Sequence, residues 1–167
     1  MASVELRPAR PEDAARLHEL HTASVRTLCA PHYPPEVIDG WLSDRQPQGY
    51  LPPIKRGVLF VAERDDAIIG FGEASAGTVV AVYVDPQAAG HGVGSALLKH
   101  ALQVARREHD GAVSVESTLN ARGFYARHGF REIGGSTVRR GAVEVSIIRM
   151  ELRSDRETQT VRPPLRR

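Results

Sequence analysis

The sequence predicts a layered α+β fold with a mixed, mostly antiparallel central sheet of about six to seven strands and helices on both faces. Three observations favour it. Short apolar segments between residues 58 and 84 are separated by tight turns, as in an antiparallel meander. A long amphipathic segment connects the last of them to another apolar segment, as a helix connects two parallel strands. Helix signals precede the meander.

The N-terminal third is expected to be mainly helical. Residues 4–7 alternate between apolar and polar side chains, which predicts a short first strand. Residues 11–14 begin with a proline and two acidic residues, which is typical of a first helical turn. The following helix presents one face formed by Leu17, Leu20, Ser24 and Leu28. A second short helix is predicted over residues 36–44, and the Pro- and Gly-rich residues 46–57 predict a loop.

The middle of the chain predicts three strands over residues 58–62, 67–74 and 78–84. Asp65-Asp66 and Ala76-Gly77 supply the two turns between them. The segment from Thr78 to Val84 is almost wholly apolar, so we expect this fourth strand to be central and covered on both faces.

The second half predicts a glycine-rich loop, a helix as far as about His109 and a fifth strand over residues 112–116. Asn120 is expected to cap a short helix that Gly129 closes. The last two strands are predicted over residues 130–133 and 142–152, joined around Gly134-Gly135.

Length and composition suit one domain, predicted to span residues 1–152. The chain has 167 residues, of which 41% are hydrophobic. The five arginines of residues 153–167 face only Asp155 and Glu157, a balance of +3, so the rest carries −1 of the net +2. We expect this basic tail to be disordered, because it is charged and has little apolar content. The body shows no excess of basic residues, so a nucleic-acid partner is not expected.

The sequence also favours a cytoplasmic protein. No run of about 18 apolar residues predicts a membrane span, and the N-terminus lacks the apolar stretch of a signal peptide. Cys29 is the single cysteine, which excludes an internal disulfide and fits a reducing compartment. No cysteine and histidine spacing is typical of a metal site, so no metal is expected.

The strongest functional signal is the loop after the fourth strand, with glycines at positions 90, 92 and 94 before a helix. Backbone N–H groups at a helix start attract anions, and glycine lets phosphate oxygens approach them. A tight turn that binds nothing is an equally good interpretation of the glycines alone. The dinucleotide fingerprint fails, because Ser95 and Leu97 stand where its last glycine should be. No Gly-Lys-Ser/Thr triplet exists, which excludes a P-loop.

Two motifs resemble the GNAT superfamily of acyl-CoA-dependent N-acyltransferases. Residues 82–84 and 90–94 are similar to the strand end and the Q/R-x-x-G-x-G/A pyrophosphate loop of that family. Gln87 begins this pattern literally, but we favour the register with Ala89 at the Arg/Gln position, because it also aligns Pro86 and Val93. Residues 117–130 resemble the later motif N-A-x-x-F-Y-x-x-x-G-F, about 30 residues after the loop. The resemblance covers roughly residues 58–152.

The resemblance implies a sheet splayed between strands 4 and 5 and direct transfer of the acetyl group of acetyl-CoA to an amine of a small molecule or a peptide. It implies a cofactor site formed by Val82, Tyr83, Val84, Ala89, Gly90, His91, Gly92, Val93, Gly94, Ser95, Asn120 and Phe124. The strand backbone would pair with the pantetheine arm. Phe124 is expected to lie mainly in the core, and its neighbour Tyr125 to face the cleft.

Tyr125 matches the tyrosine near the sulfur in that family. A phenol of pKa about 10 protonates a thiolate of pKa about 8.5 only at a cost of about 2 kcal/mol, so we describe Tyr125 as a hydrogen-bond donor to the leaving sulfur. The base is expected to be Glu73, with Glu116 as the alternative. An acyl-enzyme on Cys29 is not favoured, because nothing around it in the sequence is activating.

The amine acceptor is expected between the N-terminal helices, the Pro-rich loop and the final hairpin. Tyr33, Trp41 and Tyr50 are the aromatic candidates, and Glu36, Asp39 or Asp44 could attract a cationic amine. A non-catalytic acyl-CoA-binding regulatory module is the alternative function, and either a monomer or a homodimer is compatible with the sequence.

Overall fold

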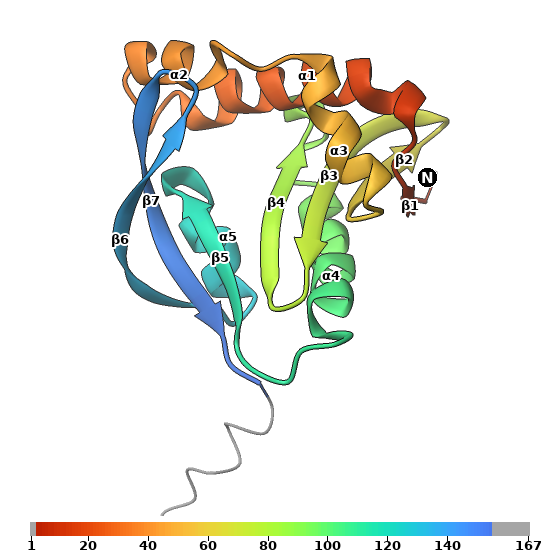
Figure 1. Ribbon diagram of the computed structural model, residues 1–167, viewed down its shortest axis with the longest axis vertical. Coiled ribbons are helices and arrows are strands. Elements are labelled where there is room, and N and C mark those ends of the chain that lie inside the picture. The colour runs from red at the N-terminus through yellow and green to blue at the C-terminus, as the bar shows by residue number, and fades with distance from the viewer. Residues whose placement is uncertain (1–2, 155–167) are drawn as a thin grey trace, which may run out of the picture.

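A computed structural model describes residues 3–154 of the chain, which form a seven-stranded mixed sheet of order β1-β2-β3-β4-β5-β7-β6 (Figure 1). The strands are β1 (Glu5–Pro8), β2 (Leu59–Arg64), β3 (Ala67–Ser75), β4 (Thr78–Val84), β5 (Val113–Thr118), β6 (Arg131–Arg140) and β7 (Val143–Leu152). Neighbouring strands are antiparallel except for β4 and β5, which are parallel. The predicted fold class is confirmed. The basic tail from residue 155 onward lies outside the described residues.

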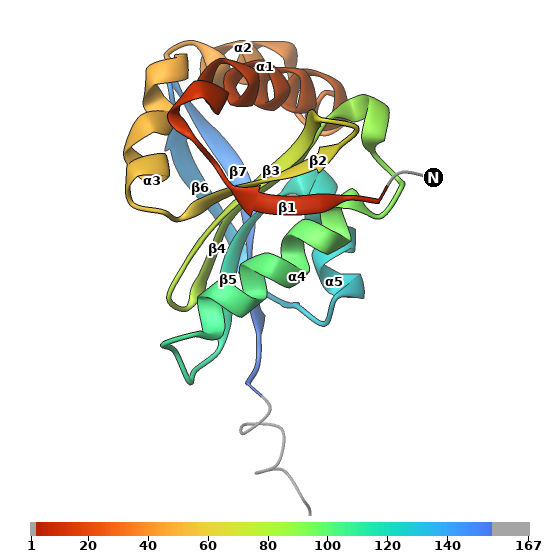
Figure 2. The same cartoon turned by 90° about the vertical axis from the view of Figure 1, so that its right-hand side faces the viewer.

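The helices lie on both sides of this sheet. They are α1 (Ala14–Ser24), α2 (Pro35–Leu42), α3 (Leu51–Lys55), α4 (Val93–Arg106) and α5 (Arg122–Arg127). A π-helical segment, η2 (Val25–Cys29), extends α1, and short 3-10 turns are η1 (Pro11–Asp13), η3 (Pro47–Tyr50), η4 (Pro86–Ala88) and η5 (Leu119–Ala121). Figure 2 shows α4 and α5 on one side of the sheet, α3 on the other, and α1 with α2 across the top.

Strand β2 shows how the two apolar layers arise. Alternate side chains of a strand point to opposite faces, and here both sets are buried. Leu59 and Val61 belong to the core cluster of α1, whereas Phe60 and Ala62 belong to the cluster of α4. The strand covered on both faces is therefore β2.

The expectation that β4 would be covered on both faces was wrong. The strand is central, but most of its residues are only half-buried, and Val80 is 46% exposed. Glu73 pairs with Ala81 and Ala74 with Val79, so Val80 forms a bulge without a partner on β3. Beyond Thr78 and Val79, β4 makes no registered pair with β5. The two strands diverge, and the apolar side chains of β4 border an open cleft.

Two further boundaries differ from the sequence prediction. Residues 46–57 are not a continuous loop, because they contain η3 and α3. Pro52 and Pro53 lie in the first turn of α3, where a helix does not need the missing N–H. The β6–β7 turn lies at Gly141, whose φ is +52°, and not at Gly134-Gly135. Those two glycines follow a bulge inside β6, which the sequence pattern presented as a turn.

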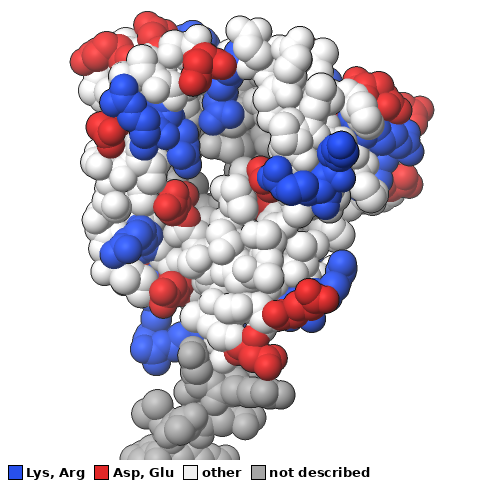
Figure 3. Space-filling model, viewed as in Figure 1, with Lys and Arg blue, Asp and Glu red and all other residues white. Residues whose placement is uncertain are grey.

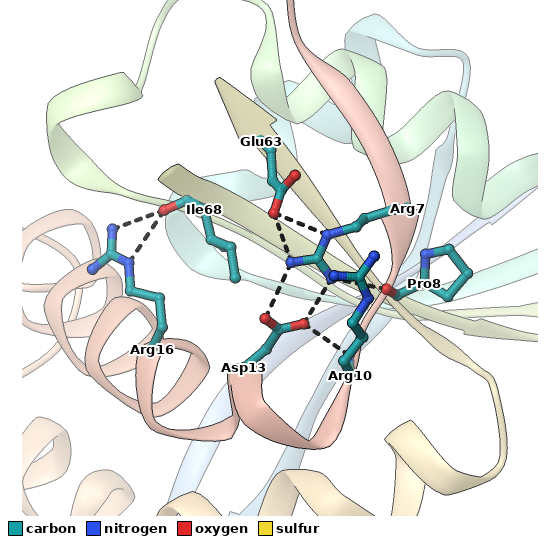
Figure 4. Close-up of polar contacts among 7 residues, drawn as sticks. All are labelled: Arg7, Pro8, Arg10, Asp13, Arg16, Glu63 and Ile68. Atoms are coloured by element: carbon teal, nitrogen blue, oxygen red, sulfur yellow. Dashed lines mark hydrogen bonds and ion pairs between the residues drawn. The ribbon is translucent and has the colours of Figure 1, made fainter. Parts of the chain in front are cut away.

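Polar contacts anchor the N-terminal segment to the sheet (Figure 4). The Arg7 guanidinium donates to both oxygens of Asp13, at 2.8 and 3.1 Å, and to Glu63 at 2.6 Å. Arg16 on α1 donates to the carbonyl of Ile68 at 2.9 Å and to the Asp85 carboxylate at 2.7 Å. The ion pair between Arg16 and Asp85 connects α1 to the residue that follows β4.

Candidate active site at the splayed strands

The loop after β4 presents backbone rather than side chains. Gly90 and Gly92 have φ values of +78° and +82°, which glycine adopts without strain. A Cβ atom at either position would meet nothing within 4 Å, so space beside both is open. Gly92 is the N-cap of α4, and the first N–H groups of a helix have no intrahelical acceptors. A helix start of this kind, with open space beside its backbone, is suited to bind an anion.

Gly94 has a different role from the other two glycines. A Cβ atom there would lie 3.3 Å from the Phe124 ring. That distance is shorter than usual contact distances, so glycine at this position lets α4 and α5 approach each other. The sequence prediction had grouped all three glycines as one phosphate loop.

A cleft of about 550 Å³ opens at this loop; we call it the loop cleft. Its walls come from the end of β4, the glycine loop, the α1–η2 helix and the η5–α5 segment. They are formed by Ser24, Leu28, Cys29, His32, Val82, Tyr83, Val84, Ala89, Gly90, Gly92, Gly94, Ser95, Thr118, Asn120, Ala121, Phe124 and Arg127. All the predicted cofactor residues are among them except two. His91 is exposed outside the cleft wall, and Val93 is buried in the core of α4.

The end of β4 offers backbone amides to the loop cleft. The amide of Asp85 donates to the carbonyl of Ile69 on β3 at 2.8 Å. Amides alternate in direction along a strand, so the Tyr83 amide also faces β3, whereas those of Val82 and Val84 face the other way. No registered pair with β5 occurs at these two residues. They can therefore pair with an extended ligand as an added strand would.

Asn120 lines the loop cleft but does not cap a helix, which corrects the sequence prediction. The N-cap of α5 is Ala121, because the 3-10 turn η5 precedes that helix. The Asn120 Oδ1 atom instead accepts a hydrogen bond from Cys29 Sγ at 3.3 Å. Burial raises the pKa of the Cys29 thiol to about 12, which disfavours the thiolate that an acyl-enzyme would require.

Phe124 and Tyr125 are placed opposite to expectation. Phe124 lines the loop cleft, whereas Tyr125 is 5% exposed and belongs to the core cluster of α4. The Tyr125 ring packs edge-on against Phe124 and Phe130, with centroids 5.1 and 5.5 Å away. Burial raises the pKa of Tyr125, and the nearby Tyr83 raises it further. The phenol is therefore a neutral donor at physiological pH.

A second cavity, of about 490 Å³, lies beside the bulge of β4; we call it the hairpin cavity. Its walls come from α1, residues 44–53, strands β2 to β4 and the β6–β7 turn. They are formed by His21, Asp44, Arg45, Gln46, Gly49, Tyr50, Pro53, Leu59, Phe71, Glu73, Val80, Ala81, Tyr83, Arg139, Arg140 and Gly141. Tyr83 also lines the loop cleft, so its side chain forms a wall that the two cavities share.

The two candidate bases have different surroundings. Glu73 lines the hairpin cavity, and burial raises its pKa, although Arg56 at 3.9 Å opposes this shift. Glu116 lines neither the loop cleft nor the hairpin cavity; its side chain is 52% exposed and lies 3.7 Å from Arg140. The geometry therefore favours Glu73 over Glu116.

The sequence analysis missed His21. Its Nδ1 atom lies 2.8 Å from the Tyr50 hydroxyl, and its ring lies 4.0 Å from that of Tyr83, measured between centroids. Burial lowers the pKa of His21 well below its usual value, so the ring is neutral. Its Nε2 atom is buried without a hydrogen-bond partner among residues 3–154. His21 follows Leu17 by four positions, so the helical period places it on the predicted inner face.

The acceptor candidates fall into two groups. Tyr50 and Asp44 line the hairpin cavity. Tyr33 and Trp41 are instead buried against β7, where the Tyr33 hydroxyl donates to the carbonyl of Ser146 at 2.6 Å. The carboxylates of Glu36 and Asp39 are exposed on α2, outside the walls of this cavity, and Asp39 pairs with Arg26 at 2.9 Å. Arginines, rather than these carboxylates, dominate the cavity.

No group of three or more His, Cys, Asp or Glu side chains among residues 3–154 has an arrangement that could hold a metal ion. None of the helices described there is long and apolar enough to cross a membrane.

Known proteins resemble this chain in sequence and in fold. The amino-acid acetyltransferase of Mycobacterium tuberculosis is 39% identical over 88 residues, which cover 48% of this chain and 49% of that protein. The chain therefore matches about half the length of this relative. A GCN5-related N-acetyltransferase from Rhodopseudomonas palustris has a TM-score of 0.85 and 24% identity, covering 92% of this chain and 97% of that one.

A third protein has the same fold with a ligand bound. The PaiA N-acetyltransferase of Thermoplasma acidophilum, solved in complex with coenzyme A, has a TM-score of 0.73 and 22% identity over 90% of this chain and 99% of that one. The family described as "Acetyltransferase (GNAT) domain" matches residues 29–154. Sequence pattern, splayed sheet and this match agree, and the chain belongs to the GNAT acetyltransferase family.

Proposed function

We propose that this chain transfers the acetyl group of acetyl-CoA directly to an amine of a small molecule or a peptide. The observation that carries the proposal is that Tyr83 lines both cavities, which therefore lie side by side. One cavity is lined by an anion-binding loop and unpaired strand amides, and the other contains a half-buried carboxylate. A reaction between two substrates requires such an arrangement, because each must reach the same point from its own side.

The loop cleft fits coenzyme A on three counts. The loop backbone from Gly90 to Ser95 would hold the pyrophosphate at the start of α4. The amides of Val82 and Val84 would pair with the pantetheine arm. Asn120 and Phe124 lie on the facing wall, where one offers an amide and the other an apolar surface. The coenzyme A complex of the Thermoplasma acidophilum protein, which has the same fold, supports this assignment.

Glu73 would act as the general base for the amine, and Tyr125 as a hydrogen-bond donor to the leaving group. Acetyl-CoA supplies the acetyl thioester, whose C–S bond breaks as the amine nitrogen forms the amide bond. Glu73, directly or through water, accepts the proton that the amine must lose, and its raised pKa favours this role. We assign to Tyr125, which lies behind the cleft wall near Tyr83, a hydrogen bond toward the sulfur that leaves; its hydroxyl stays protonated because burial raises its pKa.

A non-catalytic acyl-CoA-binding module is the second candidate. It would need the loop cleft alone. A half-buried Glu73 in an adjoining cavity has no function in such a module, whereas burial of a carboxylate costs stability. We therefore favour the enzyme. We further propose that it acts in the cytoplasm, as a monomer or homodimer, which fits the single free thiol of Cys29.

The test is release of coenzyme A thiol from acetyl-CoA over a panel of polyamines, amino acids, peptides and aromatic amines. Glu73→Gln should lower the rate with the best amine by roughly 10²-fold or more, as for loss of a general base. The loss should shrink at high pH, where the amine is already neutral. Binding of acetyl-CoA without thiol release from any amine would support the module, and an equal loss confined to Glu116→Gln would reassign the base.

A further inference from the structure

The hairpin cavity contains more basic than acidic groups. Three arginines line it, Arg45, Arg139 and Arg140, against the carboxylates of Asp44 and Glu73. On the face shown in Figure 3, basic side chains lie on both sides of the hollow in the upper half of the molecule, with acidic side chains among them. Of the acidic acceptor candidates, Asp44 lines this cavity, but the arginines outnumber the carboxylates there. A polyamine would meet repulsion here.

Arg45 is the one of these three arginines that has no carboxylate partner among the described residues. Its backbone is held in place, because its carbonyl accepts from His18 Nε2 at 3.1 Å. Within the described residues, its side chain is hydrogen-bonded to that of Tyr50 and has no carboxylate within 4.0 Å, and its Nε atom is buried without a hydrogen-bond partner. A buried donor without a partner is costly, so such a group points to an acceptor that arrives with a ligand.

Arg140 approaches the same place from the β6–β7 turn. Its contact with Glu116 is long, at 3.7 Å, and its side chain is 38% exposed. Burial is the main influence on the pKa of both His21 and Tyr83, but the charges of Arg45 and Arg140 act on both rings as well. Arg45 and Arg140 thus line one cavity from two segments that are far apart in the sequence.

The candidate base, Glu73, lines the same cavity as these two arginines. Phe71 and Glu73 both line the cavity from β3, and residues two apart on one strand face are about 6.6 Å from each other. The Phe71 ring packs 5.5 Å from that of Tyr83, measured between centroids. One small molecule in a cavity of about 490 Å³ thus meets a candidate base and a pair of guanidinium groups.

We infer that the amine acceptor carries a carboxylate beside its amine, and that Arg45 and Arg140 bind this carboxylate while Glu73 faces the amine. The chemical class is a free α-amino acid or a close analogue. The planar fork of arginine matches the two oxygens of a carboxylate, and bound in this way the substrate presents its nitrogen toward Tyr83 and the loop cleft. This inference rests on the proposed function, since it names the substrate class of the same site.

The experiment compares each of the twenty standard L-amino acids with its own α-amide, in thiol release from acetyl-CoA. The amide keeps the side chain and the amine and loses the carboxylate charge. Because this loss also lowers the pKa of the amine, each rate is expressed per concentration of neutral amine. A charge-assisted hydrogen bond corresponds to about 10- to 100-fold in affinity, so the best acid should exceed its amide by that factor in kcat/KM. Dipeptides, whose carboxylate is farther from the amine, form a third arm.

Arg45→Met and Arg140→Met should each abolish most of the acid-to-amide preference, mainly by lowering kcat/KM for the acid. Arg45→Lys should keep part of it, because it keeps the charge without the fork. Arg131→Met, at an exposed position of β6, is the matched control and should keep the preference. Because the preference is the ratio of two rates measured on the same preparation of one variant, a smaller fraction of folded protein lowers both rates equally and leaves the ratio unchanged.

Binding is measured separately, by calorimetry of the best acid and its amide with the protein saturated with coenzyme A. Tighter binding of the acid, lost in Arg45→Met, supports the inference even if no amine is acetylated, in which case only the proposed function fails. Equal use or equal binding of acids and amides overturns the inference and leaves the proposed function intact. A preference for dipeptides over every free amino acid overturns the free amino acid as the substrate.

Discussion

At the residue scale, Tyr125 shows how burial decides what a side chain can do. Its ring is packed in the core, so its hydroxyl is held in place by apolar neighbours. The raised pKa excludes a mechanism that begins from a tyrosinate at neutral pH. A fixed neutral donor is suited to stabilise charge that develops on sulfur.

Tyr125→Phe should therefore keep the cofactor and lose rate. Only the hydroxyl is removed, so packing of the ring is preserved. A donor used chiefly in the transition state affects kcat, by roughly 10²–10³-fold in a dry site and less in an open cleft. The measurement is kcat with the best amine, with acetyl-CoA affinity as the control. A variant that turns over at the wild-type rate would assign Tyr125 a structural role.

Site residues were predictable from the sequence where their role depends on the neighbouring residues in the chain, and not where it depends on tertiary packing. The glycine loop was predictable because Gly90 and Gly92 act through their own backbone conformation. Arg45 and Arg140 were not predictable, because they come from two segments that only tertiary packing brings to one cavity. The places of Phe124 and Tyr125 were interchanged because a helical period separates two faces without telling which face meets the core.

At the element scale, β4 shows why an apolar pattern was misinterpreted. Seven consecutive residues with hardly a polar side chain are typical of a strand buried between two layers. Here the same pattern occurs in a strand that pairs with β5 only as far as Val79 and then borders a cleft. A bulge at Val80 changes the direction of the strand, and nothing in the local sequence distinguishes that valine from the others.

The loop that follows β4 gives a prediction for an element rather than a residue. Gly92→Asp should weaken acetyl-CoA binding strongly, because a carboxylate at the start of α4 would repel the pyrophosphate. Calorimetric titration measures the affinity. Gly92→Ala separates the backbone contribution, since φ at this position is +82° and a methyl group would meet nothing within 4 Å.

A second control concerns stability. Gly57→Asp places the same residue at another positive-φ glycine with open space, outside the walls of both cavities. It should lose stability to a similar degree, of about 1–2 kcal/mol, without losing affinity. If Gly92→Asp binds acetyl-CoA as tightly as Gly57→Asp does, the loop does not hold the pyrophosphate.

At the scale of the whole molecule, one helix bridges the two parts of a split sheet. Leu17 and Leu20 on α1 are fully buried in the cluster of β2 and β3, whereas Val25 and Cys29, farther along the same helix, pack against Val145 and Ile147 of β7. Each fully buried aliphatic side chain contributes about 1.5–3 kcal/mol. The helix thus connects the β2–β3 side of the sheet to β7, across the gap that separates β4 from β5 and β7 in Figure 1.

The split predicts a local pattern of amide exchange. The amides of Val82 and Val84 face away from β3, and these residues have no registered pair on β5, so without ligand they should exchange faster than that of Tyr83 between them. Saturation with acetyl-CoA should slow them most, because the pantetheine arm would supply the missing strand. When the acetyl-CoA concentration is about 100 times its Kd, binding stabilises the protein by about 2.7 kcal/mol. Exchange that requires release of the ligand should then slow by roughly 100-fold.

Hydrogen exchange followed by NMR resolves these three neighbours, and the amides of the β6–β7 hairpin report any general stabilisation. Protection of Val82 and Val84 well beyond that of the hairpin would support pairing of pantetheine with β4. Equal protection throughout would mean that the ligand stabilises the fold without adding a strand. Continued fast exchange at Val82 and Val84 in the bound protein would place the pantetheine arm elsewhere, and the splay of β4 and β5 would then need another explanation.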